Sequence, residues 1–198
     1  MTLDIASVTA QLTAVTLATD GDATTLTSAV RALQHRQAIL DLTMLYGRAV
    51  DDHDVQALVE MFTEGGVFER RGDAAIGYDA IRAAYAASFD TYRTMLHTTH
   101  PPVVQLHDDA SASGWSHGHA ELATRRTLIL ASYRYEDFYR RVADRWLFAK
   151  RSLTFMYAVP VDQLATSFGT NKRIRWPGTE AEAGDYPETA RTWNTYRN

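Results

Sequence analysis

Residues 127–160, TLILASYRYEDFYRRVADRWLFAKRSLTFMYAVP, contain the pattern that decides the fold. The two long segments on either side of VADR read as β-strands, and VADR reads as the connection of a hairpin. Alternating aromatic and apolar residues in LILASYRY and LTFMYAV can supply both an inner and an outer apolar face of a sheet. The stretch therefore predicts two long strands paired as a hairpin.

The segments before this hairpin separate into a helical half and a strand half. Residues 97–126 predict two more strands, joined at the turn HDDAS. Apolar residues recur at helical spacing in VRALQHRQAILDLTMLYGRAVDD, residues 30–52, which predicts an amphipathic helix. Residues 55–62 and 77–93 predict two further helices, and a turn and a strand lie between them. This order favours an α+β fold over repeated βαβ units.

The chain divides into three parts. Residues 1–30 are rich in Thr and Ala and form an N-terminal arm, either a helix and a loop or a partly ordered segment. Residues 31–160 form the domain. Residues 161–198 form a tail that loses periodicity but has too many aromatic residues for a solvated, disordered end. We expect this tail to pack on the domain, over the mouth of a cavity or as an outer brace, or on a neighbouring subunit. Its aromatic residues are Phe168, Trp176, Tyr186, Trp193 and Tyr196.

The composition excludes several functional classes. The formal net charge is −4, from 20 basic and 24 acidic residues, so no basic face for nucleic acid or for a membrane surface is indicated. The absence of cysteine excludes disulfides, thiolate metal sites and cysteine nucleophiles. No apolar run approaches the roughly 20 residues of a membrane span, and Asp4 without a basic region argues against a signal peptide. We expect a cytoplasmic protein without nucleic-acid or membrane partners.

Four stretches, in this order, carry a resemblance to a known superfamily: LYGRAVDDHDVQALVEMF, MLHTTHPPVVQL, YRYEDFYRR and RWLFAKRSL. They resemble the nuclear transport factor two-like proteins and, within them, the SnoaL-like group that includes scytalone dehydratase, hexachlorocyclohexane dehydrochlorinase and bile acid 7α-dehydratase. The resemblance implies a cone-shaped, curved antiparallel β-sheet wrapped around N-terminal helices, the cystatin-like roll. It also implies a homo-oligomer, with a trimer favoured.

Asp51 and Tyr46 lie five residues apart near the end of the first predicted helix. An acidic residue at a helix C-terminus is disfavoured by the helix dipole, so Asp51 needs another reason to be there. A solvated turn within DDHD is one explanation. The resemblance gives another, in which Asp51 enters the cone and orients a catalytic histidine while Tyr46 lines the same pocket as a proton-donating group.

His97 and His100 lie three residues apart, a spacing that indicates opposite faces of a strand and therefore argues against a shared metal ion. A surface or turn histidine is the simplest interpretation of His97. The resemblance instead makes His97 the general base, for which a side chain that titrates near neutral pH is suited. Pro101 stands where the group has an asparagine, which leaves the local strand pairing open.

His119 shares one face of a predicted strand with Trp115 and His117. The resemblance suggests His119 as a second histidine of the pocket. A one-residue change of register would exchange the two faces of the strand, so cross-strand pairing on the outer face is the alternative.

Arg151 lies on the last predicted strand, five residues after Trp146. The resemblance suggests that it stabilises a leaving group. The alternative is a cross-sheet ion pair with Glu136 or Asp137.

The resemblance and these residues together predict a cofactor-independent lyase of the dehydratase or elimination type. His97, held by Asp51, would take a proton from a hydrophobic cyclic or aromatic small molecule, assisted by Tyr46, His119 or Arg151. An isomerase, a cyclase or a carbon–carbon lyase would fit the same proton abstraction. The alternative class is a non-catalytic ligand-binding or assembly module. No sequence motif indicates a cofactor or a metal ion.

Overall fold

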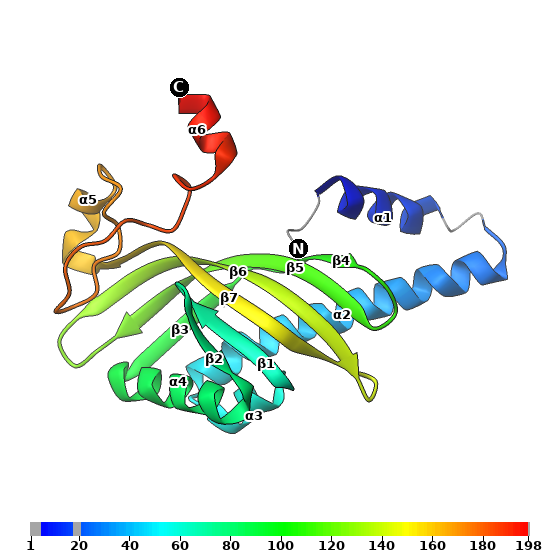
Figure 1. Ribbon diagram of the computed structural model, residues 1–198, viewed down its shortest axis with the longest axis horizontal. Coiled ribbons are helices and arrows are strands. Elements are labelled where there is room, and N and C mark those ends of the chain that lie inside the picture. Colours follow the sequence, from blue (N-terminus) through cyan, green and yellow to red (C-terminus); the bar gives the residue numbers. More distant parts are fainter. Residues whose placement is uncertain (1–4, 18–20, 198) are drawn as a thin grey trace.

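The structure is a computed structural model that describes residues 5–17 and 21–197 (Figure 1). The helices are α1 (Ile5–Leu17), α2 (Ala23–Asp51), α3 (Val55–Glu60), α4 (Gly77–Thr91), α5 (Leu164–Ser167) and α6 (Arg191–Arg197), with a 3₁₀ turn, η2, over Val161–Gln163. The strands are β1 (Phe62–Arg70), β2 (Asp73–Ile76), β3 (Thr94–Thr99), β4 (Val103–Leu106), β5 (Ser111–Ala123), β6 (Leu128–Val142) and β7 (Arg145–Pro160).

One sheet contains all of these strands, in the order β2-β1-β7-β6-β5-β3, with β4 also paired to β5. The predicted hairpin, β6 and β7, forms its centre, and the α+β class is confirmed. Most pairs are antiparallel, but β1 runs parallel to β7. No hairpin turn joins these two strands, which lie far apart in the sequence, so their relative direction is not restricted to antiparallel.

The sheet arches over α2, α3 and α4, while α1 lies on its other side, and local irregularities accompany the bend (Figure 1). The β6–β7 register shifts between Ser132 and Tyr133 and again between Phe138 and Tyr139. Bulges of this kind bend a strand and increase its twist. At Gly118 a Cβ atom would lie 2.4 Å from the Thr98 carbonyl oxygen, so a larger residue there would push β3 away from β5.

Pro101 and Pro102 divide the strand segment that was predicted as continuous. The chain forms β3 before them and β4 after them, and both strands pair with β5. Proline has no backbone N–H to donate to a ladder, which explains the interruption.

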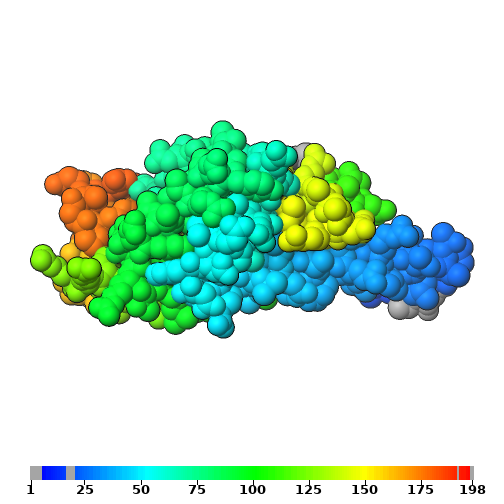
Figure 2. All heavy atoms as spheres, turned by 90° about the horizontal axis from the view of Figure 1, so that it is seen from below, coloured from blue at the N-terminus to red at the C-terminus, as the bar shows by residue number. Residues whose placement is uncertain are grey.

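The long helix α2 begins at Ala23, earlier than the predicted Val30. Asp22 caps it, because its carboxylate accepts a hydrogen bond from the Thr25 backbone N–H at 2.8 Å. The first turns are exposed and have no apolar periodicity, so the prediction missed them. Further along, Ile39, Leu42 and Tyr46 pack into the core beneath the sheet. Figure 2 shows the side of the molecule on which α3 and α4 cover the sheet.

The chain after β7 folds back on the sheet at the end opposite α1 (Figure 1). Ile174 is buried and forms isolated bridges with Ala158 and Glu182. Arg173 donates to both carboxylate oxygens of Glu188, at 2.8 and 2.7 Å, and to the Met156 carbonyl oxygen at 3.0 Å. Residues 173–188 are therefore held by specific backbone and side-chain contacts.

Candidate active site

Asp51 and His97 form a hydrogen-bonded pair. Asp51 is the last residue of α2, and His97 lies in the middle of β3. One carboxylate oxygen lies 2.7 Å from His97 Nδ1, and the other accepts the His97 backbone N–H at 3.0 Å. The side chains are only 16% and 12% exposed, so water screens the contact weakly. These two N–H donors explain how an aspartate is accommodated at a helix C-terminus.

The pairing fixes how the imidazole can react. An ionised carboxylate only accepts hydrogen bonds, so Nδ1 carries the proton and Nε2 keeps its lone pair. His97 also lines a cavity of about 880 Å³, and its ring centroid lies 5.8 Å from that of Tyr133. The histidine therefore has a carboxylate on one side and an open, ligand-sized space on another.

The cavity lies between the concave face of the sheet, α2, α4 and the tail. The sheet contributes Phe68, Ala120, Leu122, Tyr133, Tyr135, Leu153 and Phe155 to its wall, the helices contribute Tyr46, Val50, Tyr85 and Phe89, and Tyr92 follows α4 directly. Most of these side chains are apolar or aromatic, which is typical of a pocket for a small organic molecule.

Three buried phenols, those of Tyr46, Tyr85 and Tyr135, contribute polar groups to this wall. The hydroxyl groups of Tyr46 and Tyr85 are hydrogen-bonded to each other, and the rings of Tyr46 and Tyr135 meet edge to face at 5.7 Å. Burial raises the pKa of Tyr46 and that of Tyr135 well above the usual range, and it also raises the pKa of Tyr85. The three hydroxyl groups are therefore protonated at neutral pH and can donate hydrogen bonds.

Arg151 lies behind these phenols and does not line the cavity. Its Nε and Nη2 donate to the two carboxylate oxygens of Asp137, both at 2.9 Å, and both side chains are fully buried. The guanidinium carbon lies 4.1 Å from the Tyr46 ring centroid and 3.9 Å from that of Tyr135. Although burial acts to lower it, the charge and hydrogen bonds of Asp137 hold the pKa of Arg151 well above its usual range.

The predicted role of Arg151 in direct contact with a leaving group does not fit this position. The alternative, a cross-sheet ion pair with Asp137, describes what the structure places there. The guanidinium contacts the rings of Tyr46 and Tyr135, which line the cavity, whereas Arg151 itself does not.

His119 is exposed on the outer face of β5, so the predicted placement in the pocket is corrected. The next residue, Ala120, lines the cavity, as does Leu122. Because strand side chains alternate between faces, His117 shares the outer face with His119. His100 joins them there, with ring centroids 4.5 Å from His117 and 5.8 Å from His119.

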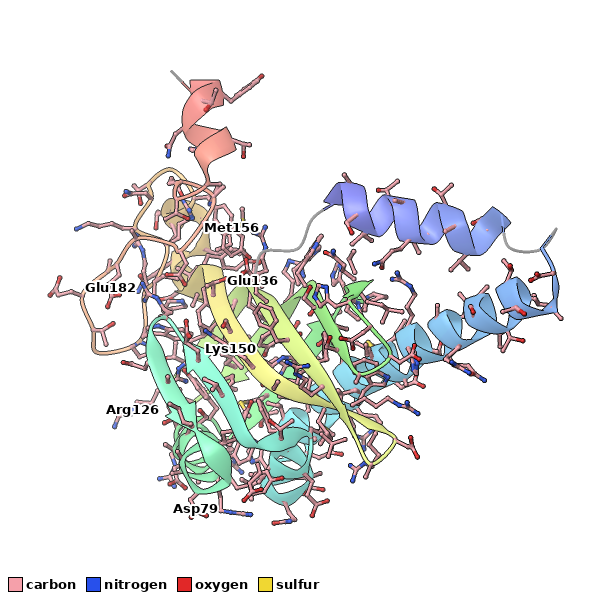
Figure 3. All side chains as sticks on the ribbon, turned by 45° about the vertical axis from the view of Figure 1, so that its right-hand side comes forward. Asp79, Arg126, Glu136, Lys150, Met156 and Glu182 are labelled. Atoms are coloured by element: carbon pink, nitrogen blue, oxygen red, sulfur yellow. The ribbon has the colours of Figure 1, made fainter. Side chains whose placement is uncertain are left out.

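The mouth of the cavity is bounded by the tip of the β1–β2 hairpin and by the tail. Arg71, in the hairpin turn, donates to Asp185 at 2.9 Å and to Glu182 at 2.8 Å. Figure 3 shows Glu182 on the tail loop beside this hairpin. The same Asp185 accepts the Phe155 backbone N–H at 2.8 Å, which ties the loop to β7 as well. Tail residues including Trp176 and Gly184 complete the rim.

The sequence patterns did not indicate the phenols of Tyr85 and Tyr135 or the contacts of Arg71. Tyr85 is buried in the core and also forms part of the cavity wall. Tyr133 and Tyr135 are two residues apart on one strand, so their side chains point to the same face of the sheet. This spacing is the signal that could have placed both on the inner face. No comparable local signal links Arg71 to acids more than a hundred positions away.

Over residues 5–17 and 21–197, no group of three or more His, Asp or Glu side chains is arranged to hold a metal ion. In the same part of the chain, none of the helices combines the length and the apolar character needed to cross a membrane.

The chain belongs to the SnoaL-like domain family, which residues 31–152 match. This confirms the resemblance inferred from the four sequence stretches. No curated protein matches the chain.

Solved structures confirm the fold. A candidate scytalone dehydratase from Novosphingobium aromaticivorans is 19% identical, with a TM-score of 0.62 over 65% of this chain and 89% of the other. Hexachlorocyclohexane dehydrochlorinase LinA-type3 from Novosphingobium barchaimii is 18% identical, with a TM-score of 0.62 over 67% of this chain and 93% of the other. An NTF2-like protein with a cystatin-like fold, from Novosphingobium aromaticivorans, is 24% identical, with a TM-score of 0.58 over 69% of this chain and 92% of the other. At these identities the likeness establishes architecture, not activity.

Proposed function

We propose that this protein is a cofactor-independent lyase of the dehydratase or elimination type, acting on a hydrophobic cyclic or aromatic small molecule. The observation that carries the proposal is the Asp51–His97 pair beside a cavity that also contains the Tyr46–Tyr85 hydroxyl pair. A base and hydrogen-bond donors that share one mostly apolar space suit proton abstraction from carbon.

In the proposed reaction, Nε2 of His97 takes a proton from a carbon next to an activating group. The electrons of that C–H bond form the new double bond, and hydroxide or halide leaves from the neighbouring carbon. Asp51 stabilises the imidazolium that forms. In the Tyr46–Tyr85 pair one O–H is used between the two phenols, and the other donates a hydrogen bond to the departing group. A departing hydroxide takes up the proton that His97 abstracted and leaves as water, which returns the imidazole to its neutral form.

The structural neighbours support this reaction class, because two of them bear the names of a dehydratase and a dehydrochlorinase. The same proton abstraction would serve an isomerase, a cyclase or a carbon–carbon lyase. The other class is a non-catalytic binding module. A buried carboxylate that orients a cavity histidine favours the enzyme, since a binding module has no need of it.

The test is a screen of hydroxylated and halogenated cyclic compounds, with mass spectrometry to detect loss of water or of hydrogen halide. His97→Ala is expected to abolish the turnover found with wild-type protein while the circular dichroism spectrum stays unchanged. His119→Ala is the matched control, because it removes an exposed histidine from the outer face. Full turnover by His97→Ala, or saturable binding with no chemical change in any compound, would refute the proposal.

A further inference from the structure

Arg70 lies on the cavity side of β1. Phe68, two residues earlier, is buried and its ring stacks on Tyr85 with the centroids 5.0 Å apart. Since strand side chains alternate, Arg70 shares this inner face with Phe68. Its register partner on β7 is Leu153, and both residues line the cavity.

The side chain of Arg70 has no hydrogen bond or ion pair within residues 5–17 and 21–197, although its backbone is part of the sheet. The acids around it are mostly engaged elsewhere. Asp185 and Glu182 bind Arg71, and Glu69 binds Lys150 at 2.6 Å. Asp73 is the exception, because it is the register partner of Arg70 on β2, lines the same cavity and forms no ion pair with it.

Tyr92, directly after α4, lines the same cavity as Arg70 and is half-buried. Burial raises the pKa of Tyr92, and the positive charge of Arg70 acts in the opposite direction. Together they offer several N–H donors, a positive charge and one O–H donor, which is the set that a carboxylate accepts.

This cation is separated from the candidate catalytic groups by an apolar stretch. Tyr85 and Phe89 lie on α4, and Tyr92 directly follows the helix. At the rise of a helix, the seven steps from Tyr85 to Tyr92 correspond to about 10 Å. Met95 and Leu122 line the wall between Tyr92 and His97. The cavity thus has the candidate catalytic pair at one end, an apolar middle and, at its mouth among mostly paired acidic residues, an arginine whose side chain has no ion-pair partner in the described part of the chain.

We propose that Arg70 and Tyr92 form a subsite for a carboxylate, and that the ligand is an amphipathic acid whose ring lies near His97 while its carboxylate lies at the mouth. The position of the reacting ring rests on the lyase function proposed above. The anion subsite itself does not depend on any reaction.

The probes are 4-phenylbutanoate and its amide, 4-phenylbutanamide, which match in shape and differ in charge. Their length is on the order of the 10 Å span from Tyr85 to Tyr92. Affinities would be measured by NMR titration of the full chain at low ionic strength, where exposed charges are least screened. We expect the carboxylate to bind wild-type protein about fivefold more tightly than the amide, as for a partly exposed charge-assisted contact.

Two variants locate the preference. Arg70→Gln is expected to remove it by weakening carboxylate binding while amide binding stays the same. Asp73→Asn is expected to strengthen carboxylate binding, because it removes the one negative charge in the cavity that lacks a partner among residues 5–17 and 21–197. Equal affinities in wild-type protein, no binding of either probe, or a preference that survives in Arg70→Gln would overturn the inference.

The lyase proposal and this subsite can fail separately. The titration with His97→Ala is expected to show the same carboxylate preference as wild-type protein, whether or not that variant has lost turnover. If the carboxylate is still preferred over the amide but no lyase activity is found, the lyase proposal fails and the carboxylate subsite stands. Turnover of neutral substrates that is insensitive to Arg70→Gln and to ligand charge would leave a lyase without the subsite.

Discussion

Asp51 contacts His97 at two separate atoms, the ring Nδ1 at 2.7 Å and the backbone nitrogen at 3.0 Å. One carboxylate thus orients the imidazole and also ties the end of α2 to β3. A purely structural aspartate would need only the backbone contact. The additional contact to the ring sets the tautomer that proton abstraction requires.

Asp51→Asn separates these two roles. The amide has the same shape and can still accept one of the two N–H groups, but it cannot stabilise a positively charged imidazole. We expect kcat to fall on the order of 10²–10³-fold, within the range for general acid–base catalysis. The free energy of unfolding should fall by only about 1 kcal/mol, the value of one hydrogen bond. Steady-state kinetics with urea titrations would measure both, and an unchanged kcat would contradict the catalytic role.

Arg151→Met tests the buried ion pair beneath the phenols. The substitution leaves the Asp137 carboxylate buried without its cation, so we expect a loss of about 3–5 kcal/mol in the free energy of unfolding. Asp137→Asn in the same chain removes the unpaired charge, and this double variant should recover part of the loss. Urea denaturation checks both values. Equal stability of the single variant and the wild type would show that the pair contributes little.

The sequence predicted the central hairpin and the α+β class because long alternating strands and an amphipathic helix are local patterns. It also placed Asp51 and His97 together, through a resemblance that covers both stretches. It could not decide the face of His119, because a single-residue register change reverses the whole strand. The Arg151–Asp137 pair stayed one of two alternatives, since only the packed sheet shows that Arg151 does not line the cavity.

His35 makes the stability of the fold depend on pH. It is buried, and its Nδ1 accepts a hydrogen bond from Trp146 Nε1–H at 3.3 Å. Burial lowers the pKa of His35 below its usual 6.5, the positive charges of Arg141 and Arg31 act in the same direction, and Asp109 opposes them. The unfolded chain therefore binds the proton more readily than the folded one. Stability from this group is complete above about pH 6.5 and falls as the pH decreases below it.

His35→Asn keeps an acceptor for Trp146 but does not titrate. We expect the midpoint of urea unfolding to fall less between about pH 7.5 and 5.5 in this variant than in wild-type protein. Carboxylates contribute to the pH dependence of both proteins, so the difference between the two slopes is the measured quantity. Parallel slopes would assign the acid sensitivity to other groups, such as His117, whose pKa is also lowered, first by burial.

Arg71 links the β1–β2 hairpin to the tail at the rim of the cavity by binding Asp185 and Glu182. Arg71→Ala removes both ion pairs, but Asp185 keeps its hydrogen bond from the Phe155 backbone N–H, so the fold of the sheet should survive. We expect the Asp185 backbone N–H, which donates to the Phe155 carbonyl oxygen at 2.8 Å, to exchange with solvent about tenfold faster, equivalent to roughly 1.4 kcal/mol of local stability. Lys150→Ala is the matched control, because it removes an ion pair with Glu69 that does not involve the tail. Hydrogen exchange measured by NMR gives both rates. Equal exchange in the two variants would show that the backbone contacts alone hold the tail over the mouth.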